Sequence, residues 1–157
     1  MTAPATLPPI EELLPHRGTM RLIDRVAEFA DDAARAEFRP DAGAWYADAA
    51  GDMPGWFGLE LMAQTVAAHV ALVKRRAGRP VKPGVLLGAR AYRCRAPAFA
   101  AGRILSIRAR EIFRDESGLA GYECAIADGA ETLAEAMLKV YEPDDFARFM
   151  REQAGAA

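Results

Sequence analysis

The sequence predicts an α+β domain in which an antiparallel sheet wraps around a single long helix. Two observations predict it: one dense apolar helical segment follows Pro54 and Gly55, and after it come four strand-like segments separated by turn signals. Such a helix must bury its apolar surface, and the face of an antiparallel sheet is the surface that this order of elements offers. The chain has 157 residues, about half of them apolar, which favours one domain with a substantial core.

The segment before the long helix is expected to hold a short helix and a hairpin. Pro8 and Pro9 begin the short helix, acidic residues occupy its first turn, and Pro15 ends it. The expected elements are a helix over residues 10–14, a strand over 20–29, a turn at 31–32, a weaker strand over 34–39 and a loop over 40–52.

The long helix is expected to be buried on most of its circumference and to end near Gly78 and Pro80, after a basic last turn. The later segments are expected to be strands over 84–95, 102–114, 118–127 and 131–141, with turns at 115–118 and 128–129. The domain is thus expected to span residues 1–157, with 1–8 and 146–157 frayed and a helical turn or two after Asp144.

Composition excludes several classes of function. The net charge of −2 does not favour nucleic acid as a partner. The two cysteines, Cys94 and Cys124, lie far apart, which argues against a disulfide scaffold or zinc site, and we expect no metal. Neither a signal peptide nor an uninterrupted apolar span of about 20 residues is seen, so we expect a cytoplasmic protein without a membrane span.

A long helix wrapped by an antiparallel sheet is the hotdog arrangement, and the motifs resemble one family of hotdog proteins. The run 14–26, with Leu-Pro-His-Arg and then Met-Arg-Leu-Ile-Asp-Arg-Val, is similar to the opening of FabZ-type dehydratases. The run 54–64, Pro-Gly-Trp-Phe-Gly-Leu-Glu-Leu-Met-Ala-Gln, is similar to their central helix. Across residues 13–145 the chain most resembles the ApeP-like 3-hydroxyacyl-[acyl-carrier-protein] dehydratases of aryl polyene biosynthesis.

The resemblance implies a hydro-lyase that removes water from a 3-hydroxyacyl thioester to give the trans-2-enoyl thioester, in aryl polyene or fatty-acid-like biosynthesis. The acyl group would be carried on the phosphopantetheine of an acyl carrier protein, and no cofactor is expected. An isolated hotdog sheet leaves an unpaired edge, so we expect a homodimer, or a hetero-oligomer with another dehydratase or a ketosynthase. A hotdog thioesterase and a non-catalytic subunit paired with an active partner stay open as alternatives.

Glu60 is the main candidate for catalysis, because an unpaired carboxylate inside an apolar helix is costly and would serve as an acid when protonated. Gly55 and Trp56 offer first-turn amides to a thioester carbonyl, although Pro54-Gly55 could equally be a turn that begins the helix. Gln64 lies one turn after Glu60 and would hold Glu60, a water or only the backbone.

The base is less plainly marked. FabZ-like enzymes place a histidine in the loop before the helix, and in this chain that position falls near Tyr46, a further candidate for the substrate site. His69 lies nine residues after Glu60, about half a circle around the helix, so both cannot face one pocket. His16 is left as the expected base, facing the same cavity as Glu60, with Glu60 of the partner subunit favoured.

Basic residues near the end of the helix and on the next strand could steer an acidic carrier protein, or could simply complement the helix dipole. They are Lys74, Arg75, Arg76, Arg79, Lys82, Arg90, Arg93 and Arg95. Asp24 and Arg25 are expected to form an ion pair with each other.

Overall fold

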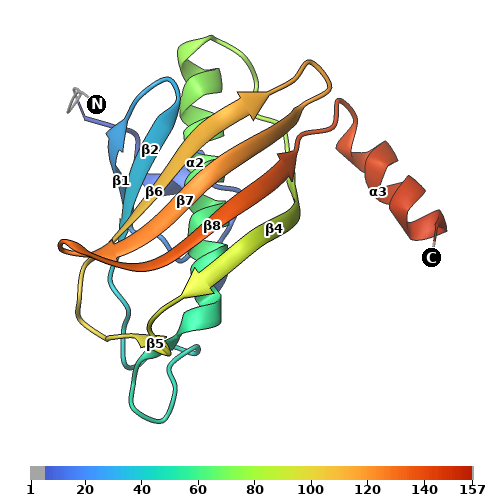
Figure 1. The fold of residues 1–157 in the computed structure, drawn as a ribbon. Coiled ribbons are helices and arrows are strands. Elements are labelled where there is room, and N and C mark those ends of the chain that lie inside the picture. The colour runs from blue at the N-terminus through green and yellow to red at the C-terminus, as the bar shows by residue number, and fades with distance from the viewer. Residues whose placement is uncertain (1–5, 157) are drawn as a thin grey trace.

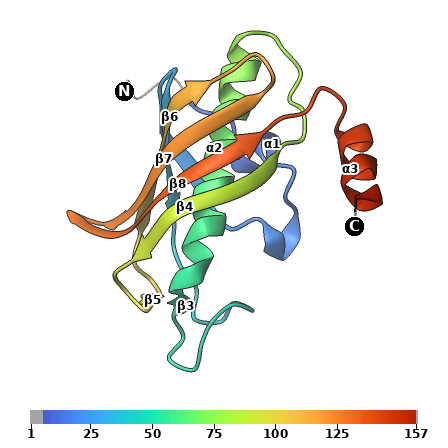
Figure 2. The same ribbon diagram turned by 45° about the vertical axis from the view of Figure 1, so that its right-hand side comes forward.

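The computed structural model describes residues 6–156, in which a six-stranded antiparallel sheet curves around the long helix α2 (Figures 1 and 2). The strand order in the sheet is β1-β2-β6-β7-β8-β4, and a separate two-stranded pair joins β3 to β5. The helices are α1 (Ile10–Leu13), α2 (Gly58–Arg76) and α3 (Phe146–Gly155), with 3-10 turns η1 (Gly18–Met20) and η2 (Gly55–Phe57). The strands are β1 (Arg25–Phe29), β2 (Ala33–Phe38), β3 (Met53–Pro54), β4 (Val85–Cys94), β5 (Ala98–Phe99), β6 (Leu105–Arg114), β7 (Leu119–Asp128) and β8 (Glu131–Tyr141).

The predicted hotdog architecture is confirmed. The differences lie at the ends of the predicted elements and in the short β3–β5 pair and the two 3-10 turns, which were not predicted. The first strand begins at Arg25 rather than at residue 20, because the amides of Leu22 and Ile23 hydrogen-bond the buried Gln64 side chain instead of a neighbouring strand. The tail forms the ten-residue helix α3, capped by the Asp145 carboxylate, which accepts a hydrogen bond from the Arg148 amide at 2.9 Å. This helix projects away from the sheet (Figure 2). The expectation for residues 1–5 and 157 lies outside the described residues.

The expected ion pair between Asp24 and Arg25 is wrong. Asp24 instead accepts a hydrogen bond from the Arg39 amide at 2.9 Å, and Arg25 pairs across the hairpin with Glu37 at 2.7 Å. Because β1 and β2 are antiparallel and place Arg25 opposite Glu37, the cross-strand partner is closer to Arg25 than its neighbour in sequence.

Helix α2 carries the core, with one side left open. Its apolar side chains face the sheet and the β3–β5 pair, and Leu61, Met62 and Ala68 are fully buried. By length and composition the segment Gly55–Arg76 could cross a membrane, but its packing against the sheet makes it the core helix of the domain. The open side is a stripe at helical spacing that holds Glu60, Ala63, Ala67 and Val70, all partly exposed, so burial is less complete than expected.

Strand β4 forms one edge of the sheet, pairing within the chain only with β8. Most of its residues are exposed, including Leu86 and Leu87, which are about half exposed. Ala91 adopts a positive φ of 52°, where the register shifts between Arg90 and Arg93. An exposed edge with apolar side chains is the kind of surface that strand pairing between subunits covers.

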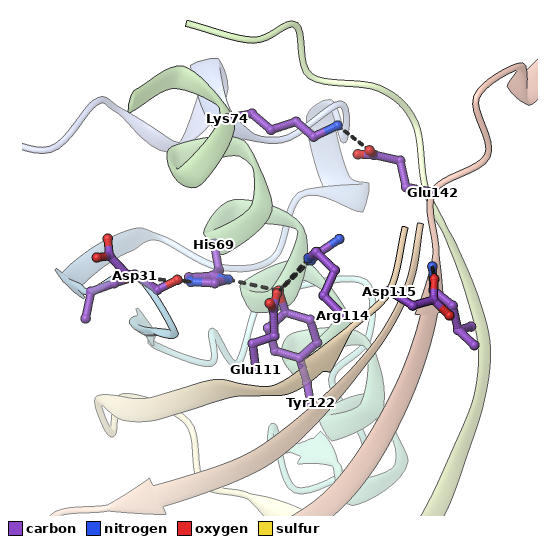
Figure 3. A network of polar contacts seen from close by, with 10 residues as sticks. Asp31, His69, Lys74, Glu111, Arg114, Asp115, Tyr122 and Glu142 are labelled. Carbon is purple, nitrogen blue, oxygen red and sulfur yellow. Dashed lines mark hydrogen bonds and ion pairs between the residues drawn. The ribbon is translucent and has the colours of Figure 1, made fainter. Parts of the chain in front are cut away.

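A polar network lies between α2 and the sheet (Figure 3). His69 is fully buried, and its Nδ1 lies 2.9 Å from the Tyr122 hydroxyl. Its Nε2 lies 3.3 Å from the Ala30 carbonyl and 3.1 Å from the Asp31 carbonyl, so that nitrogen carries a proton. The Tyr122 hydroxyl also lies 2.7 Å from Glu111 Oε2. His69 is therefore a structural residue that ties the helix to the hairpin and the sheet.

Burial lowers the pKa of His69 below its ordinary value of 6.5, which makes folding stability depend on pH. Below pH 6.5 the unfolded chain binds more protons at this residue than the folded chain does. The contribution of His69 is thus fully present above pH 6.5 and is lost as the pH falls toward the lowered pKa.

We expect the His69→Gln variant to lose about 1–3 kcal/mol of unfolding free energy at pH 7.5, because the Tyr122 hydroxyl and the carbonyls lose a matched partner. The difference from the wild type should narrow as the pH falls from 6.5 to 5. Urea unfolding of both proteins at each pH measures it, and the comparison cancels every other titrating group. A constant difference would show that folding leaves the His69 pKa unshifted, and a widening one that folding raises it, so either result would contradict the expectation.

Candidate active site

A cavity of about 800 Å³ runs along the open stripe of α2. Glu60, Ala63, Ala67 and Val70 form one wall, and the loop that contains His16 forms another. Small side chains at the second and third of these helix positions leave the space that larger residues would fill. The cavity therefore exists because the stripe is small and partly apolar, with a carboxylate at one end.

His16 and Glu60 meet at that end. The His16 Nε2 lies 3.4 Å from Glu60 Oε1 in the same chain, and the two side chains are 27% and 41% exposed. They face a common cavity, as expected from the sequence, but the partner-subunit arrangement is not needed to bring them together. Both groups can exchange protons, so this end of the cavity can bind, donate and accept a proton within one small volume.

The loop that carries His16 is held by its neighbour Arg17. The Arg17 guanidinium donates to the Leu14 carbonyl at 2.6 Å and to the His16 carbonyl at 2.9 Å. Leu13 and Leu14 are buried against the core, so the loop is fixed at its base as well. Sequence reasoning did not single out Arg17 for this task, although its position directly after His16 was visible.

Gln64 fixes Glu60 from behind. Its Nε2 donates to Glu60 Oε1 and to the Met20 carbonyl, both at 2.9 Å, and its Oε1 accepts from the Leu22 amide at 2.9 Å. Gln64 is fully buried and does not line the cavity, so it positions Glu60 and the adjoining chain rather than holding substrate. The sequence left three partners open for Gln64, namely Glu60, a water or only the backbone, and the structure shows that it bonds both Glu60 and the backbone.

Gly55 begins η2 in a crowded place. Its amide donates to the Pro97 carbonyl at 2.9 Å, so this N–H already has a partner and is not aimed at a ligand. A Cβ at this position would lie 2.9 Å from both the Ala96 carbonyl oxygen and Cys94 Sγ. The glycine therefore allows the start of the helix to pack against the segment before β5, and the thioester-binding role expected of its amide has no support in this arrangement.

Tyr46 and Trp56 do not line the cavity with His16 and Glu60. Tyr46 is buried, its hydroxyl accepts a hydrogen bond from the Asp41 amide at 2.9 Å, and burial raises the pKa of its phenol. A raised pKa leaves even less of the phenolate, the basic form of the side chain, at neutral pH than in a free tyrosine. Trp56 is the middle residue of η2 and is 70% exposed. Neither residue is placed to touch a ligand beside Glu60 in this chain.

The basic residues that could steer a carrier protein are largely paired with acids of the same chain. Lys74 contacts Glu142 and Arg76 contacts Asp31. The other pairs are Arg75–Glu12, Lys82–Asp144 and Arg95–Glu135. Within residues 6–156, Arg79, Arg90 and Arg93 form no such pair, so the basic surface is smaller than the sequence suggested.

The site holds two ionisable side chains, His16 and Glu60, in a partly apolar cavity. Among residues 6–156 no group of three or more His, Cys, Asp or Glu side chains is arranged to hold a metal ion. His69, the other histidine, lies in the core network on a different side of α2.

Comparison with known proteins agrees with this geometry. A family model described as ApeP-like, ApeP dehydratase, matches residues 8–151. Among solved structures, the dehydratase heterocomplex ApeI:P from Xenorhabdus doucetiae is 26% identical, with a TM-score of 0.86 over 93% of this chain and 97% of that one. No relative is found among curated proteins.

More distant structures share the fold alone. An uncharacterized protein from Pyrococcus horikoshii is 18% identical, with a TM-score of 0.64 over 88% of this chain and 97% of that one. A hypothetical thioesterase with coenzyme A from Streptococcus pneumoniae is 12% identical, with a TM-score of 0.60 over 75% of this chain and 84% of that one.

Proposed function

This chain belongs to the ApeP-like dehydratase family, and on that premise we propose that it removes water from a 3-hydroxyacyl thioester carried by an acyl carrier protein, giving the trans-2-enoyl thioester. The observation that carries the proposal is the His16–Glu60 pair at 3.4 Å at one end of a cavity long enough for an acyl group. A hydro-lyase of this kind needs one base and one acid on the two sides of a C2–C3 bond, and this end of the cavity holds one candidate for each.

In the proposed mechanism neutral His16 takes the C2 proton as the electron pair of that C–H bond forms the C2–C3 double bond. The C3–O bond breaks, and protonated Glu60 gives its proton to the departing hydroxyl, which leaves as water. His16 is then protonated and Glu60 ionised. Because Nε2 and Oε1 are 3.4 Å apart, the proton can return from His16 to Glu60 and restore the starting state.

Gln64 supports this cycle by holding the shared oxygen. Its amide donates to Glu60 Oε1, the oxygen that faces His16, and so restricts rotation of the carboxyl group. A preorganised carboxyl group loses less entropy when it reaches the reactive geometry.

The proposal also covers the oligomeric state of the protein and the compartment and pathway in which it acts. The related structure from Xenorhabdus doucetiae is the dehydratase heterocomplex ApeI:P, and the exposed β4 edge offers a surface for such pairing. We infer that this chain acts in the cytoplasm, in aryl polyene or fatty-acid-like synthesis, either as a homodimer or with a second dehydratase subunit.

A product assay on the purified protein tests the function. A 3-hydroxyacyl group loaded on a carrier protein is incubated with the chain alone, and the products are separated by mass spectrometry. We expect the enoyl thioester, which is lighter than the substrate by the mass of the lost water, about 18 Da. If the product is the free acid, the protein is a thioesterase instead. If the substrate is unchanged, the protein is a non-catalytic subunit.

A further inference from the structure

The far end of the cavity is polar, unlike its middle. From Glu60 the cavity runs along Ala63, Ala67 and Val70, and its lining also includes Arg114 of β6. Arg114 and Val70 line a neighbouring pocket as well, which places the guanidinium beyond the apolar stretch. The helix rises about 15 Å from Glu60 to Val70 at 1.5 Å per residue. With each extended C–C bond advancing about 1.25 Å, that distance corresponds to roughly a dozen carbons.

The Arg114 guanidinium is held by hydrogen bonds but keeps one nitrogen without an acceptor in the described part of the chain (Figure 3). Its Nε and Nη2 donate to Glu111 Oε2 at 3.0 and 2.7 Å, and Nη2 also donates to the Tyr122 hydroxyl at 3.1 Å. Tyr122 is fully buried and is itself held by His69, so the guanidinium rests on a rigid support. Within residues 6–156 its Nη1 donates to no acceptor, and the side chain is 32% exposed.

We propose that Arg114 is a specificity-determining residue that donates a hydrogen bond from Nη1 to a neutral oxygen, such as a hydroxyl, at the far end of a long acyl group. The proposal rests on the proposed function and adds a substrate class to it. An acyl chain with a methyl end would cover Nη1 without giving it an acceptor, which is costly for a charged donor.

The charge balance favours a neutral oxygen over a phosphate. The Glu111 carboxylate already neutralises the guanidinium, and a dianion beside it would be repelled by the same carboxylate. The other cations of the neighbouring pocket, Lys74, Arg79 and Lys82, lie there with the acids Asp115, Glu116, Glu142 and Asp144, so the pocket holds no excess of positive charge for a dianion. The acyl end is therefore a better occupant of this position than the phosphate of the phosphopantetheine arm.

Equilibrium binding tests this assignment without requiring turnover. The ligands are two unreactive 3-hydroxyacyl pantetheine amides of equal length, about twelve carbons, one ending in a hydroxyl and one in a methyl group. By isothermal titration we expect the wild type to bind the hydroxyl-ended ligand about 10- to 100-fold more tightly, the range for a hydrogen bond to a charged group. Arg114→Met should remove that preference, and the methyl-ended ligand should bind the variant at least as tightly as it binds the wild type, because the donor that it leaves unpaired is gone.

Arg110→Met is the matched control. Arg110 lies on the same strand, pairs with Glu123 across to β7 and does not line the cavity with Glu60, so this variant should keep the preference. If Arg114→Met does not fold, as judged by thermal unfolding, Arg114→Lys provides the test, with a preference reduced but not abolished. Equal binding of both ligands by the wild type, or a preference as large in the Arg114 variants as in the wild type, would overturn the proposal.

A third ligand separates the two possible oxygens. If adding a phosphate to the methyl-ended pantetheine amide restores tight binding through Arg114, the residue recognises the carrier arm and the proposal is wrong. If the wild type discriminates between the acyl ends but makes no enoyl product, the proposed dehydration fails while the assignment of Arg114 stands.

Discussion

Replacing Glu60 with glutamine is expected to lower kcat for dehydration by about 10²- to 10⁴-fold, the usual contribution of a general acid or base. The amide keeps the shape of the side chain but has no proton to give to the departing hydroxyl. Steady-state turnover of a 3-hydroxyacyl thioester, followed by the absorbance of the enoyl product, measures the loss. Since Glu60 is 41% exposed, the fold should be little affected, and the melting temperature checks this.

Glu123→Gln is a suitable control for that experiment. Glu123 is an exposed carboxylate on β7 that pairs with Arg110 and does not line the cavity with His16. Its replacement should change turnover by less than about twofold. A folded Glu60→Gln protein with normal turnover would make Glu60 a structural residue and remove the proposed mechanism.

His16→Ala is expected to reduce turnover by a similar factor of about 10²–10⁴, because the elimination then lacks its base. The structure provides a second expectation, on stability. The His16 Nδ1 is buried and has no hydrogen-bond partner among residues 6–156, so removing the ring also removes an unsatisfied polar atom. The free energy of unfolding should therefore change by less than about 1 kcal/mol, and a loss of activity would reflect chemistry rather than folding.

The double variant His16→Ala, Glu60→Gln distinguishes a cooperating pair from two separate roles. If the two residues act in one proton cycle, the double variant should be hardly slower than either single one. Multiplied effects would mean independent tasks. Unchanged turnover in His16→Ala would exclude His16 as the base and would return attention to residues outside this cavity, Tyr46 among them.

Much of the fold could be predicted because proline, glycine and turn residues in the sequence mark where its helices and strands begin and end. Pro54 and Gly55 mark the start of the helical segment, Gly78 follows its basic last turn, and the strands of the second half are separated by turn residues such as Asp128 and Gly129. These signals are local, and the secondary structure they predict survives in the folded protein with changes of a few residues at the ends. Glu60 was found in the same way, as a carboxylate that interrupts an apolar helix.

Contacts between distant segments were decided by the tertiary structure. The His16–Glu60 distance depends on how the loop after α1 docks on α2, and Gln64 sets that docking through amides more than 40 residues earlier in the chain. No pattern in sequence reports which side chain satisfies a particular buried amide. The pairing of Arg25 with Glu37 and of the Gly55 amide with Pro97 arises from strand register and close packing in the same way.

The sequence by itself thus determined the helix, the strands and the hotdog architecture, because these follow from periodicity, turn residues and local motifs. The chemistry expected of Glu60 and a histidine followed from the family resemblance and stays a prediction. Only the tertiary structure decided that His16 meets Glu60 of its own chain and that Gln64 lies behind the cavity rather than in it. It also placed Arg114 at the far end of the cavity. The physical reason is that hydrogen-bond satisfaction and packing are settled among residues far apart in the chain, after the local elements have formed.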